Sequence, residues 1–315
     1  MTSTSGPVLL LLEGAARASS RPFKMTAWNP LELPIHPLDL GVTRGDGVFE
    51  SVGVIDGRPM ELHAHLERLE RSAEMLDLQA LHIGAIGDGV VAAIRQHDPV
   101  PELLVKIFVT RGREHEFDPT VWIYGMEGPD YSSDRSNGID VVTLNRGYPR
   151  NIAQVAPWLL QGAKTLSYAV NRAALREAAR RGADDAVFLS SDGYVLEGPA
   201  STLIIRDSTG YRTPPADDGV LPGTTQARIF AGLEAAGYRT LTGPIEEKEL
   251  RSAEAAWLVS SGRMCVPIRA LDGCGMEIDH QATQQMMAIL VRPSHSDGQD
   301  RPTGPSSPRA SLHGW

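Results

Sequence analysis

The alternation of apolar and polar residues predicts an α+β unit in the first half of the chain. In "GVFESVGVIDGRPM" it predicts two strands joined by a turn at Asp56 and Gly57. The next segment, "LHAHLERLERSAEMLDL", has apolar residues every three or four positions, which is typical of an amphipathic helix. "ELLVKIFVTRG" and "TVWIYGM" are expected to form two further strands. Together these elements predict a small α+β domain over residues 25–126.

A second, larger domain is predicted over residues 139–290, after the polar, turn-rich residues 127–138, which are interpreted as a linker. It begins with the strand "IDVVTLNRG". A helix is predicted over residues 168–181, because Gly182 follows its last turn. "DAVFLSS" and "YVLEG" flank an Asp-Gly pair and predict a hairpin, and "STLIIRD" predicts a third strand. Another helix is expected from "TTQARIFAGLEAAG", directly after a Pro-Gly pair.

The two ends of the chain have patterns of their own. Residues 1–24 hold the predicted strand "VLLLLEGA" and an arm rich in Ala, Ser and Arg, which is expected to be loosely held or to lie on a partner. That strand is too short for a signal sequence and lacks a basic segment before it. Residues 291–315 lose the apolar periodicity and gain Pro, Ser and Gly, which predicts a disordered tail.

Composition and charge narrow the functional classes. With 315 residues, 42% hydrophobic and 22% charged, the chain is typical of a globular protein, and it has no run of eighteen apolar residues. A net charge of −9 argues against nucleic acid and anionic membranes as partners, and leaves room for a local basic pocket. Two cysteines, Cys265 and Cys274, suggest neither a disulfide framework nor a metal site, which fits a reducing cytoplasm.

Lysine usage points to one candidate for covalent chemistry. The chain has only four lysines, and the 30 basic residues are otherwise arginines. Lys164 stands between small residues ahead of the helix predicted from residue 168. Partial burial there would disfavour the ammonium form and make the amine a nucleophile, which no arginine becomes. The alternative is an exposed loop lysine.

Three further motifs each have a functional and an ordinary interpretation. Glu197, at a strand end, is either solvated or placed to bind the nitrogen of a pyridine ring. Thr224 and Thr225 follow Gly223 at a helix start, which suits an anion or a simple N-cap. Arg68 either supplies a positive charge to the same anion or pairs with a neighbouring glutamate on the surface.

The loop "TRGREHEFD" contains Arg111, Arg113 and His115, and is either a trap for a substrate carboxylate or a solvated charge cluster. A metal site at His63 and His65 lacks a third ligand, so both histidines are interpreted as polar residues at a helix start. "GAIGDG" does not match the dinucleotide-binding pattern, and the chain has no G-x-S-x-G motif.

Taken together, five ordered motifs resemble the class IV, or fold type IV, aminotransferase family of pyridoxal 5'-phosphate enzymes. The resemblance covers residues 35–275 and rests on "DLGVTRGDGVFES", "HLERLERSAEML", "GAKTLSYAVNRAALREAARRGADDAVFLSSDGYVLEGPAST", "GVLPGTTQAR" and "WLVSSGRMCVPIRALDG". It implies a small α+β domain, a larger β-barrel-like domain with helices, and a homodimer whose active sites lie at the domain junction.

The resemblance also implies residue roles. Lys164 would bond covalently to the cofactor aldehyde and carry protons, and Glu197 would contact the pyridine nitrogen. The other implied cofactor-binding residues are Arg68, Tyr168, Thr224, Thr225 and Ser261. The implied substrate-binding residues are Phe49, Arg113, His115, Gly262 and Arg263, with Arg113 and His115 in a loop that closes over the neighbouring subunit's site.

Departures from the family pattern bear on the substrate. Thr202 and Gln226 stand where the family often has Asn and Arg, Arg44 replaces an aromatic residue, and the loop holding Arg113 is short. The motifs most resemble the aminodeoxychorismate lyase-like proteins of actinobacteria, which implies conversion of 4-amino-4-deoxychorismate to 4-aminobenzoate and pyruvate. A D-amino acid aminotransferase is the alternative because of Arg113 and His115, followed by a branched-chain aminotransferase. A protein that binds pyridoxal phosphate or another anion without turnover is the non-enzyme alternative.

Overall fold

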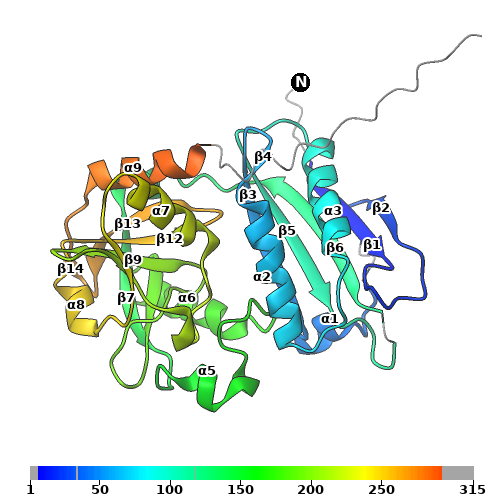
Figure 1. Cartoon of the computed structure of the whole chain (residues 1–315), viewed down its shortest axis with the longest axis horizontal. Coiled ribbons are helices and arrows are strands. Elements are labelled where there is room, and N and C mark those ends of the chain that lie inside the picture. Colours follow the sequence, from blue (N-terminus) through cyan, green and yellow to red (C-terminus); the bar gives the residue numbers. More distant parts are fainter. Residues whose placement is uncertain (1–5, 33–34, 117, 293–315) are drawn as a thin grey trace, which may run out of the picture.

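The chain folds into two lobes that lie side by side (Figure 1). A computed structural model describes residues 6–32, 35–116 and 118–292. The lobe formed by the first 127 residues is a sheet covered by helices, and the other is a larger curled sheet with helices around it. This arrangement confirms the predicted α+β, two-domain, fold type IV architecture.

In the small domain, the strands form a sheet with the order β2-β1-β6-β5-β3-β4. Every neighbouring pair in it is antiparallel, and the predicted hairpin is β3 and β4, with Asp56 and Gly57 in the turn. The strands are β1 (Val8–Glu13), β2 (Lys24–Trp28), β3 (Gly47–Ile55), β4 (Arg58–Pro59), β5 (Glu102–Thr110) and β6 (Thr120–Glu127).

Two long helices, α2 (Leu62–Met75) and α3 (Ile83–Gln96), lie side by side over one face of this sheet (Figure 1). The predicted apolar stripe of α2 is buried, including Leu66 and Leu69, and each such leucine contributes roughly 1.5–3 kcal/mol of burial. The sequence pattern does not predict α3, whose three glycines disfavour a helix. Packing of Ile86 and other apolar residues against the sheet stabilises α3 nevertheless. A short helix, α1 (Leu40–Arg44), precedes β3.

The first residues of the N-terminal arm are held by their own domain, whereas residues 20–24 are exposed. Ala15 and Ala16 are 1% exposed, and Ala16 forms a β-bridge with Leu81. The backbone N–H of Arg17 donates to the carbonyl of Ala80 at 2.7 Å. These backbone groups therefore have partners within the small domain. The arm then continues into β2, the edge strand of the sheet.

The two domains are joined through the segment predicted as a linker, which contains the helix α4 (Ser132–Asn137). Arg135 donates two hydrogen bonds, of 2.6 and 2.8 Å, to the carboxylate of Glu102 in the small domain. Its Nε also donates to the carbonyl of Arg263 in the large domain, at 3.0 Å. One guanidinium therefore connects a strand end of each domain.

The large domain is built on a mixed sheet with the order β11-β10-β9-β12-β13-β7-β8, to which β14 adds beside β13. The pairs β10–β11, β13–β7 and β7–β8 are parallel, and the other pairs are antiparallel. Its strands are β7 (Ile139–Asn145), β8 (Asp185–Leu189), β9 (Thr202–Asp207), β10 (Gly210–Thr213), β11 (Thr240–Thr242), β12 (Ala255–Ser260), β13 (Met264–Leu271) and β14 (Cys274–Gly275).

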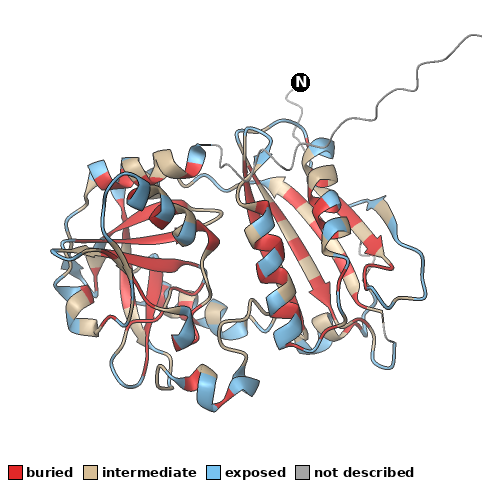
Figure 2. Cartoon of the chain, in the orientation of Figure 1, coloured by how far each residue is buried: buried red, intermediate tan, exposed pale blue. Residues whose placement is uncertain are grey.

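Helices cover this sheet, whose strands are largely buried (Figure 2). The predicted helices of residues 168–181 and 224–237 are α6 and α7, and α9 packs beside α7 over the fully buried Trp257. The helices are α5 (Ile152–Val155), α6 (Ala169–Arg180), α7 (Thr224–Ala235), α8 (Glu247–Arg251), α9 (His280–Val291), and the 3-10 turns η1 (Pro157–Leu159) and η2 (Ala216–Asp218).

The predicted hairpin of the large domain differs in the structure, and the predicted tail lies almost wholly outside the described residues. In the predicted hairpin, only β8 is a regular strand. The second arm is irregular and forms two backbone hydrogen bonds with Phe188. The N–H of Leu196 donates to the carbonyl of Phe188, and the N–H of Phe188 donates to the carbonyl of Glu197, both at 2.8 Å. Of the predicted tail, Val291 ends α9, and residues 293–315 lie outside the described residues. Within the described part of the chain, each helix is too short or too polar to cross a membrane.

The backbone of the large domain approaches Gly53 of β3 closely, and this generates a prediction. A Cβ atom on Gly53 would lie 2.4 Å from the carbonyl oxygen of Ser261 and 2.5 Å from the end of the flexible Met60 side chain. Because a backbone carbonyl cannot simply rotate away, Gly53→Ala is expected to destabilise the protein by about 1–3 kcal/mol. Thermal unfolding measures this change.

Gly84→Ala is the matched control, because Gly84 is exposed in α3 with no atom within 4 Å of an added Cβ. This substitution is expected to leave the melting temperature unchanged or to raise it slightly, since alanine favours a helix. Equal melting temperatures for the two variants would contradict the proposed close approach.

Candidate active site

Backbone pairing across the domain junction fixes the position of Lys164. Its carbonyl accepts a hydrogen bond from the N–H of Phe49 at 3.0 Å, and its own N–H donates to Ser72 Oγ at 3.2 Å. Thr165 forms a β-bridge with Val48. The segment that carries the lysine therefore lies against the beginning of β3, although more than a hundred residues separate the two in sequence.

The side chain of Lys164 is partly buried, and its Nζ lies 4.6 Å from the centre of the Phe49 ring. Burial and, next, the positive charge of Arg68 together lower the pKa of Lys164 to about 8, against the opposing effects of Glu50 and Glu197. A neutral amine is therefore available near neutral pH, as a nucleophile or proton acceptor requires.

Glu197 faces the same cavity from the irregular arm beside β8. Burial raises the pKa of its carboxyl to about 7, although the N–H of Leu221 donates to it at 3.2 Å and the charges of Lys164 and Arg146 oppose the rise. A carboxyl group with this pKa exchanges its proton near neutral pH. It is suited to bind a basic ring nitrogen and to share that nitrogen's proton.

A hydrogen-bonded network that the sequence analysis missed surrounds Glu197. Arg146 lies 4.3 Å from the centre of the Phe188 ring and donates to Tyr148 at 2.8 Å and to Asn171 at 3.2 Å. The only sequence signal for Arg146 is its place just after a strand, in "TLNRG". It lines the cavity and supplies a positive charge near Glu197.

Tyr168 and Asn171 meet at one backbone oxygen. The hydroxyl of Tyr168 and the side-chain amide of Asn171 donate to the carbonyl of Pro199 at 2.5 and 2.6 Å. The Tyr168 ring packs edge-on against Phe49, with the ring centres 5.5 Å apart. Burial raises the pKa of Tyr168 to about 12, so the phenol stays protonated as a hydrogen-bond donor.

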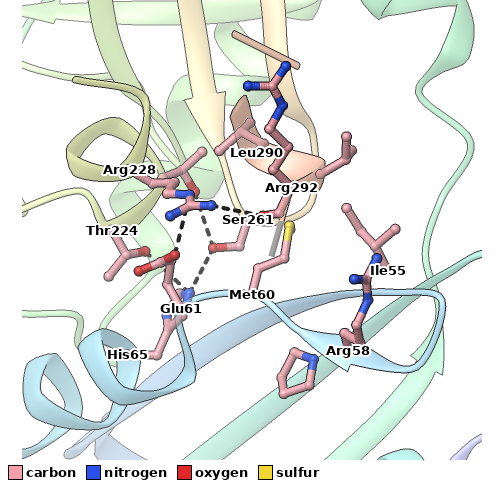
Figure 3. A pocket seen from close by; sticks show the side chains of 13 residues that line it. Ile55, Arg58, Met60, Glu61, His65, Thr224, Arg228, Ser261, Leu290 and Arg292 are labelled. Carbon is pink, nitrogen blue, oxygen red and sulfur yellow. Dashed lines mark hydrogen bonds and ion pairs between the residues drawn. The ribbon is translucent and has the colours of Figure 1, made fainter. Parts of the chain in front are cut away.

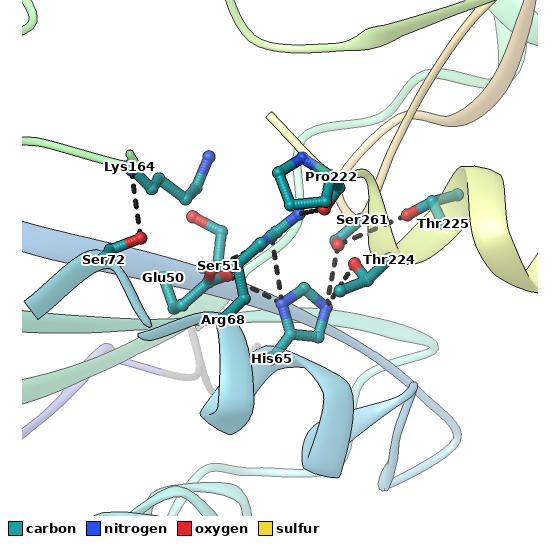
Figure 4. Close-up of polar contacts among 10 residues, drawn as sticks. All are labelled: Glu50, Ser51, His65, Arg68, Ser72, Lys164, Pro222, Thr224, Thr225 and Ser261. Carbon is teal, nitrogen blue, oxygen red and sulfur yellow. Dashed lines mark hydrogen bonds and ion pairs between the residues drawn. The ribbon is translucent and has the colours of Figure 1, made fainter. Parts of the chain in front are cut away.

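A buried ionic cluster holds Arg68 (Figure 4). Glu50 is fully buried, and its carboxylate accepts hydrogen bonds from Arg68 at 2.7 and 2.9 Å and contacts His65 Nδ1 at 2.7 Å. Burial raises the pKa of Glu50, but Arg68 and His65 outweigh this effect and hold the pKa below its usual range. Arg68 is therefore a buried cation and not the surface arginine of the alternative interpretation.

The interpretation of both histidines as polar residues at a helix start is wrong for His65. His63 is exposed and lies 3.2 Å from Glu67, as expected. His65, in contrast, is 1% exposed, and its Nε2 lies 3.2 Å from Thr224 Oγ1 and 3.1 Å from Ser261 Oγ. The helical repeat turns His65 toward the core, and the second domain provides its partners.

Three hydroxyls from the large domain thus meet the Arg68 cluster. Thr224 and Thr225 come from the first turn of α7, and Ser261 comes from the turn between β12 and β13. Thr225 Oγ1 and Ser261 Oγ are 3.5 Å apart. Hydroxyls at the positive end of a helix, with a guanidinium beside them, form an arrangement that suits a phosphate group.

Lys164, Glu197 and the three hydroxyls line one cavity of about 550 Å³ at the domain junction. Nine predicted site residues line it: Phe49, Arg68, Lys164, Tyr168, Glu197, Thr224, Thr225, Ser261 and Gly262. Its lining also includes the apolar residues Leu104, Leu159 and Trp158, of which Trp158 is 74% exposed. Among the described residues, no group of His, Cys, Asp and Glu is placed to hold a metal ion.

The structure does not bring three predicted substrate-binding residues into this cavity. His115 is exposed, and Arg113 forms an ion pair of 2.7 Å with Glu116. Arg263 binds the buried carboxylate of Asp185 and lies over the ring of Tyr131 instead of lining the cavity. Arg111 is structural as well, since its guanidinium donates to Asp46 at 2.7 Å.

The three positions that depart from the family pattern lie in different places relative to the cavity. Thr202 is buried and lines the cavity, and Gln226 is partly buried in the first turn of α7. Arg44 is exposed at the end of α1, where it donates to the carbonyl of Thr43 at 3.2 Å.

The residues present fit pyridoxal 5'-phosphate. The hydroxyl of Ser201 lines the cavity and is buried, with no hydrogen-bond partner among the described residues. Buried hydroxyls are normally paired, so this one is available to a bound group. The cavity therefore offers an amine for an aldehyde, a carboxyl for a ring nitrogen, and hydroxyls with a guanidinium for a phosphate.

Comparisons with known proteins agree with this fit. Residues 47–271 match the family of class IV amino-transferases. A bifunctional aminodeoxychorismate lyase and D-amino acid transaminase from Mycobacterium tuberculosis is 39% identical over 76% of this chain and 86% of its own length. A fold IV transaminase from Curtobacterium pusillum is 46% identical, with a TM-score of 0.87, over 91% of this chain and 100% of its own. A structure described as a hypothetical aminotransferase from M. tuberculosis in its pyridoxal phosphate-bound form is 36% identical, with a TM-score of 0.80, over 84% of this chain and 96% of its own.

The fold and the cavity define an enzyme of fold type IV that depends on pyridoxal phosphate. The chain belongs to the class IV aminotransferase family.

The environment of Lys164 predicts how its reactivity changes with pH. An amine with a pKa of about 8 is about one-tenth neutral at pH 7, whereas an ordinary lysine is almost wholly protonated. The rate at which the cofactor-free protein reacts with pyridoxal, followed by absorbance, is therefore expected to rise with a midpoint near pH 8. Lys164→Arg is expected to abolish this phase, and a midpoint near pH 10 would contradict the assignment.

The raised pKa of Glu197 predicts that this residue lowers the stability of the cofactor-free protein near neutral pH, although its proposed function requires it. The folded state keeps the proton up to about pH 7, whereas the unfolded state loses it near pH 4.5. The contribution of Glu197 to stability therefore falls as the pH rises from 4.5 to 7. Glu197→Gln is expected to stabilise the cofactor-free protein at pH 8 by about 1–2 kcal/mol, because the side chain is only partly buried.

Urea unfolding at pH 4.5 and pH 8 measures this effect. The gain from Glu197→Gln should vanish at the lower pH, and turnover should fall at both. A variant that is less stable than the wild type at pH 8 would show that the carboxylate is stabilised there.

Proposed function

We propose that this enzyme is a 4-amino-4-deoxychorismate lyase, which cleaves its substrate into 4-aminobenzoate and pyruvate. The observation that carries the proposal is the pair of groups, Lys164 and Glu197, that face one cavity with pKa values moved toward neutrality in opposite directions. The two products together contain all the atoms of the substrate, so the reaction needs proton transfers and no second substrate.

Each proposed role belongs to a residue of this chain. When bound, pyridoxal phosphate supplies an aldehyde that captures the substrate amine and a ring that draws electrons from the substrate carbon. Lys164 would remove the proton from the carbon that bears the amine, since its own amine is partly neutral at pH 7. Glu197 would keep a proton at the ring nitrogen. Arg68, with Thr224, Thr225 and Ser261, would hold the phosphate.

The lining of the cavity supports a cyclic substrate. Phe49, Leu104 and Trp158 contribute apolar and aromatic surface to the cavity that Lys164 lines, and its volume of about 550 Å³ is in the range of sites that enclose a small molecule. This surface suits a cyclohexadiene ring that becomes aromatic in the product. The name of the relative from M. tuberculosis, which includes aminodeoxychorismate lyase, supports the same substrate.

A second candidate is transamination of D-amino acids, which is supported by the second activity in that relative's name. In this reaction Lys164 would return the proton to the cofactor, and the substrate would not lose enolpyruvate. His115 is exposed and Arg113 is half-buried, and both lie outside the cavity of their own chain. We propose that Arg113 and His115 act on the substrate carboxylate in a neighbouring subunit of a homodimer.

Product analysis tests both candidates in one experiment. Purified enzyme with 4-amino-4-deoxychorismate is expected to form 4-aminobenzoate and pyruvate, detected by fluorescence and by a coupled assay. Lys164→Ala should lower this rate about 10³-fold or more, because it removes the proton acceptor. Formation of pyruvate only from D-alanine with 2-oxoglutarate would replace the lyase with the transaminase.

The double substitution Arg113→Ala and His115→Ala separates the two activities further. It is expected to weaken D-alanine transamination and to leave the absorbance of the bound cofactor unchanged, because both residues lie outside the cavity that holds it. Substitution of exposed Arg58, a surface cation outside this cavity, is the matched control.

A further inference from the structure

His65 is the only described histidine whose ring joins the ionic cluster of the small domain to the hydroxyls of the large domain (Figure 4). On one side of the ring, Nδ1 lies 2.7 Å from Glu50 Oε2. On the other side, Nε2 lies 3.2 Å from Thr224 Oγ1 and 3.1 Å from Ser261 Oγ. Thr224 and Ser261 also line the cavity, so His65 lies directly behind the proposed phosphate site.

The charge of Glu50 decides where the hydrogen atoms lie. The two hydrogen bonds from Arg68 keep Glu50 ionised, and an ionised carboxylate only accepts hydrogen bonds. Nδ1 must therefore carry a hydrogen. In the neutral ring Nε2 is then an acceptor, so at least one hydroxyl of Thr224 and Ser261 points its hydrogen toward His65 and away from the cavity.

A dianionic phosphate above these hydroxyls creates a conflict. Its oxygens accept hydrogen bonds, but a hydroxyl whose hydrogen is bound to Nε2 cannot donate to them. The conflict is relieved when Nε2 gains a hydrogen of its own, because the ring then donates to the hydroxyl oxygens and both hydroxyls turn their hydrogens toward the anion.

We propose that His65 is a proton-linked positioning residue: binding of a dianion at Thr224, Thr225 and Ser261 transfers one proton from solvent to Nε2 of His65. The inference rests on the proposal that these hydroxyls hold the cofactor phosphate. The imidazolium would lie between the Glu50 carboxylate and the bound dianion, two negative groups that compensate its charge.

The charged groups around the ring are consistent with this balance. Glu50 on β3 favours the proton, whereas Arg68 on α2 and Lys164 oppose it. Without an anion, burial and these two cations lower the pKa of His65, so the ring is neutral. A dianion in the cavity adds the negative charge that is missing on the side of Nε2.

A second, smaller cavity gives the proton a route to the ring (Figure 3). It has a volume of about 30 Å³, which is enough for about one water molecule. His65, Thr224 and Ser261 line it, together with Glu61 and Arg228, which form an ion pair of 3.5 Å. The hydroxyl layer therefore separates this chamber from the cofactor cavity.

Calorimetry with sulfate tests the proposal. Sulfate remains a dianion between pH 6 and 9, so any proton taken up on its binding ends on the protein. The cofactor-free Lys164→Ala variant is used, because Lys164 itself gains protons near an anion. Titration at pH 7.5 in buffers of different ionisation enthalpy gives the number of protons bound, and pyridoxamine phosphate must displace the sulfate that is counted.

Uptake of about one proton is expected in the Lys164→Ala background. Adding His65→Gln should reduce it to near zero, while the glutamine amide still donates to the hydroxyls and preserves measurable affinity. His63→Gln, an exposed substitution two residues away on the same helix, is the matched control and should leave the count unchanged.

Uptake that persists in His65→Gln, or no uptake in Lys164→Ala, would overturn the proposal. If His65→Gln does not fold, which circular dichroism reports, the pair Thr224→Val and Ser261→Ala replaces it. That pair keeps the Glu50–Arg68 core, and an unchanged proton count in it also overturns the proposal.

The outcomes separate this inference from the proposed function. Correct products without proton uptake would contradict only the role of His65. Proton uptake in a protein that forms neither 4-aminobenzoate nor a keto acid would contradict only the assigned reactions.

Discussion

The carboxylate of Glu50 binds Arg68 and His65 at the same time, at 2.7 Å each, in a place that solvent does not reach. A charge in such a place is stable only when it is paired and hydrogen-bonded, so both partners must keep their positions. Arg68 then presents its charge to the cavity, and the ring of His65 holds the hydroxyls of Thr224 and Ser261. A single buried charge on β3 thus orders the proposed phosphate site and, through His65, ties the small domain to the large one.

The same strand also positions the reactive lysine. Phe49, next to Glu50, bonds through its backbone to Lys164 and places its ring 4.6 Å from the amine. Burial disfavours the charged form of both Lys164 and Glu197. It therefore lowers the pKa of the lysine and raises the pKa of the carboxyl group. This arrangement is unfavourable for the stability of the cofactor-free protein and favourable for chemistry near pH 7, as is common at active sites.

In the proposed function, the substrate is selected by parts of the molecule that lie outside the proposed cofactor-binding residues. Trp158 and Leu159 belong to the loop between β7 and Lys164, and the Arg113 loop belongs to the far end of β5. Neither contributes to the ionic cluster of Glu50, so both can change without disturbing the phosphate site. Lyase and transaminase chemistry can therefore share one set of cofactor contacts.

The sequence by itself determined the elements with strong periodicity, such as α2, α6 and the β3–β4 turn, because local spacing decides which face is apolar. It also proposed Lys164, Glu197 and the Thr224–Thr225 turn as site residues, from their chemistry and from the family resemblance, and the structure places them around one cavity. Only the tertiary structure decided that the glycine-rich α3 is a helix, that His65 links two domains, and that Arg146 stands near Glu197. It likewise placed Arg263 on Asp185 and the Arg113 loop outside the cavity. These outcomes depend on contacts between residues far apart in the chain, and local sequence patterns carry no information about such partners.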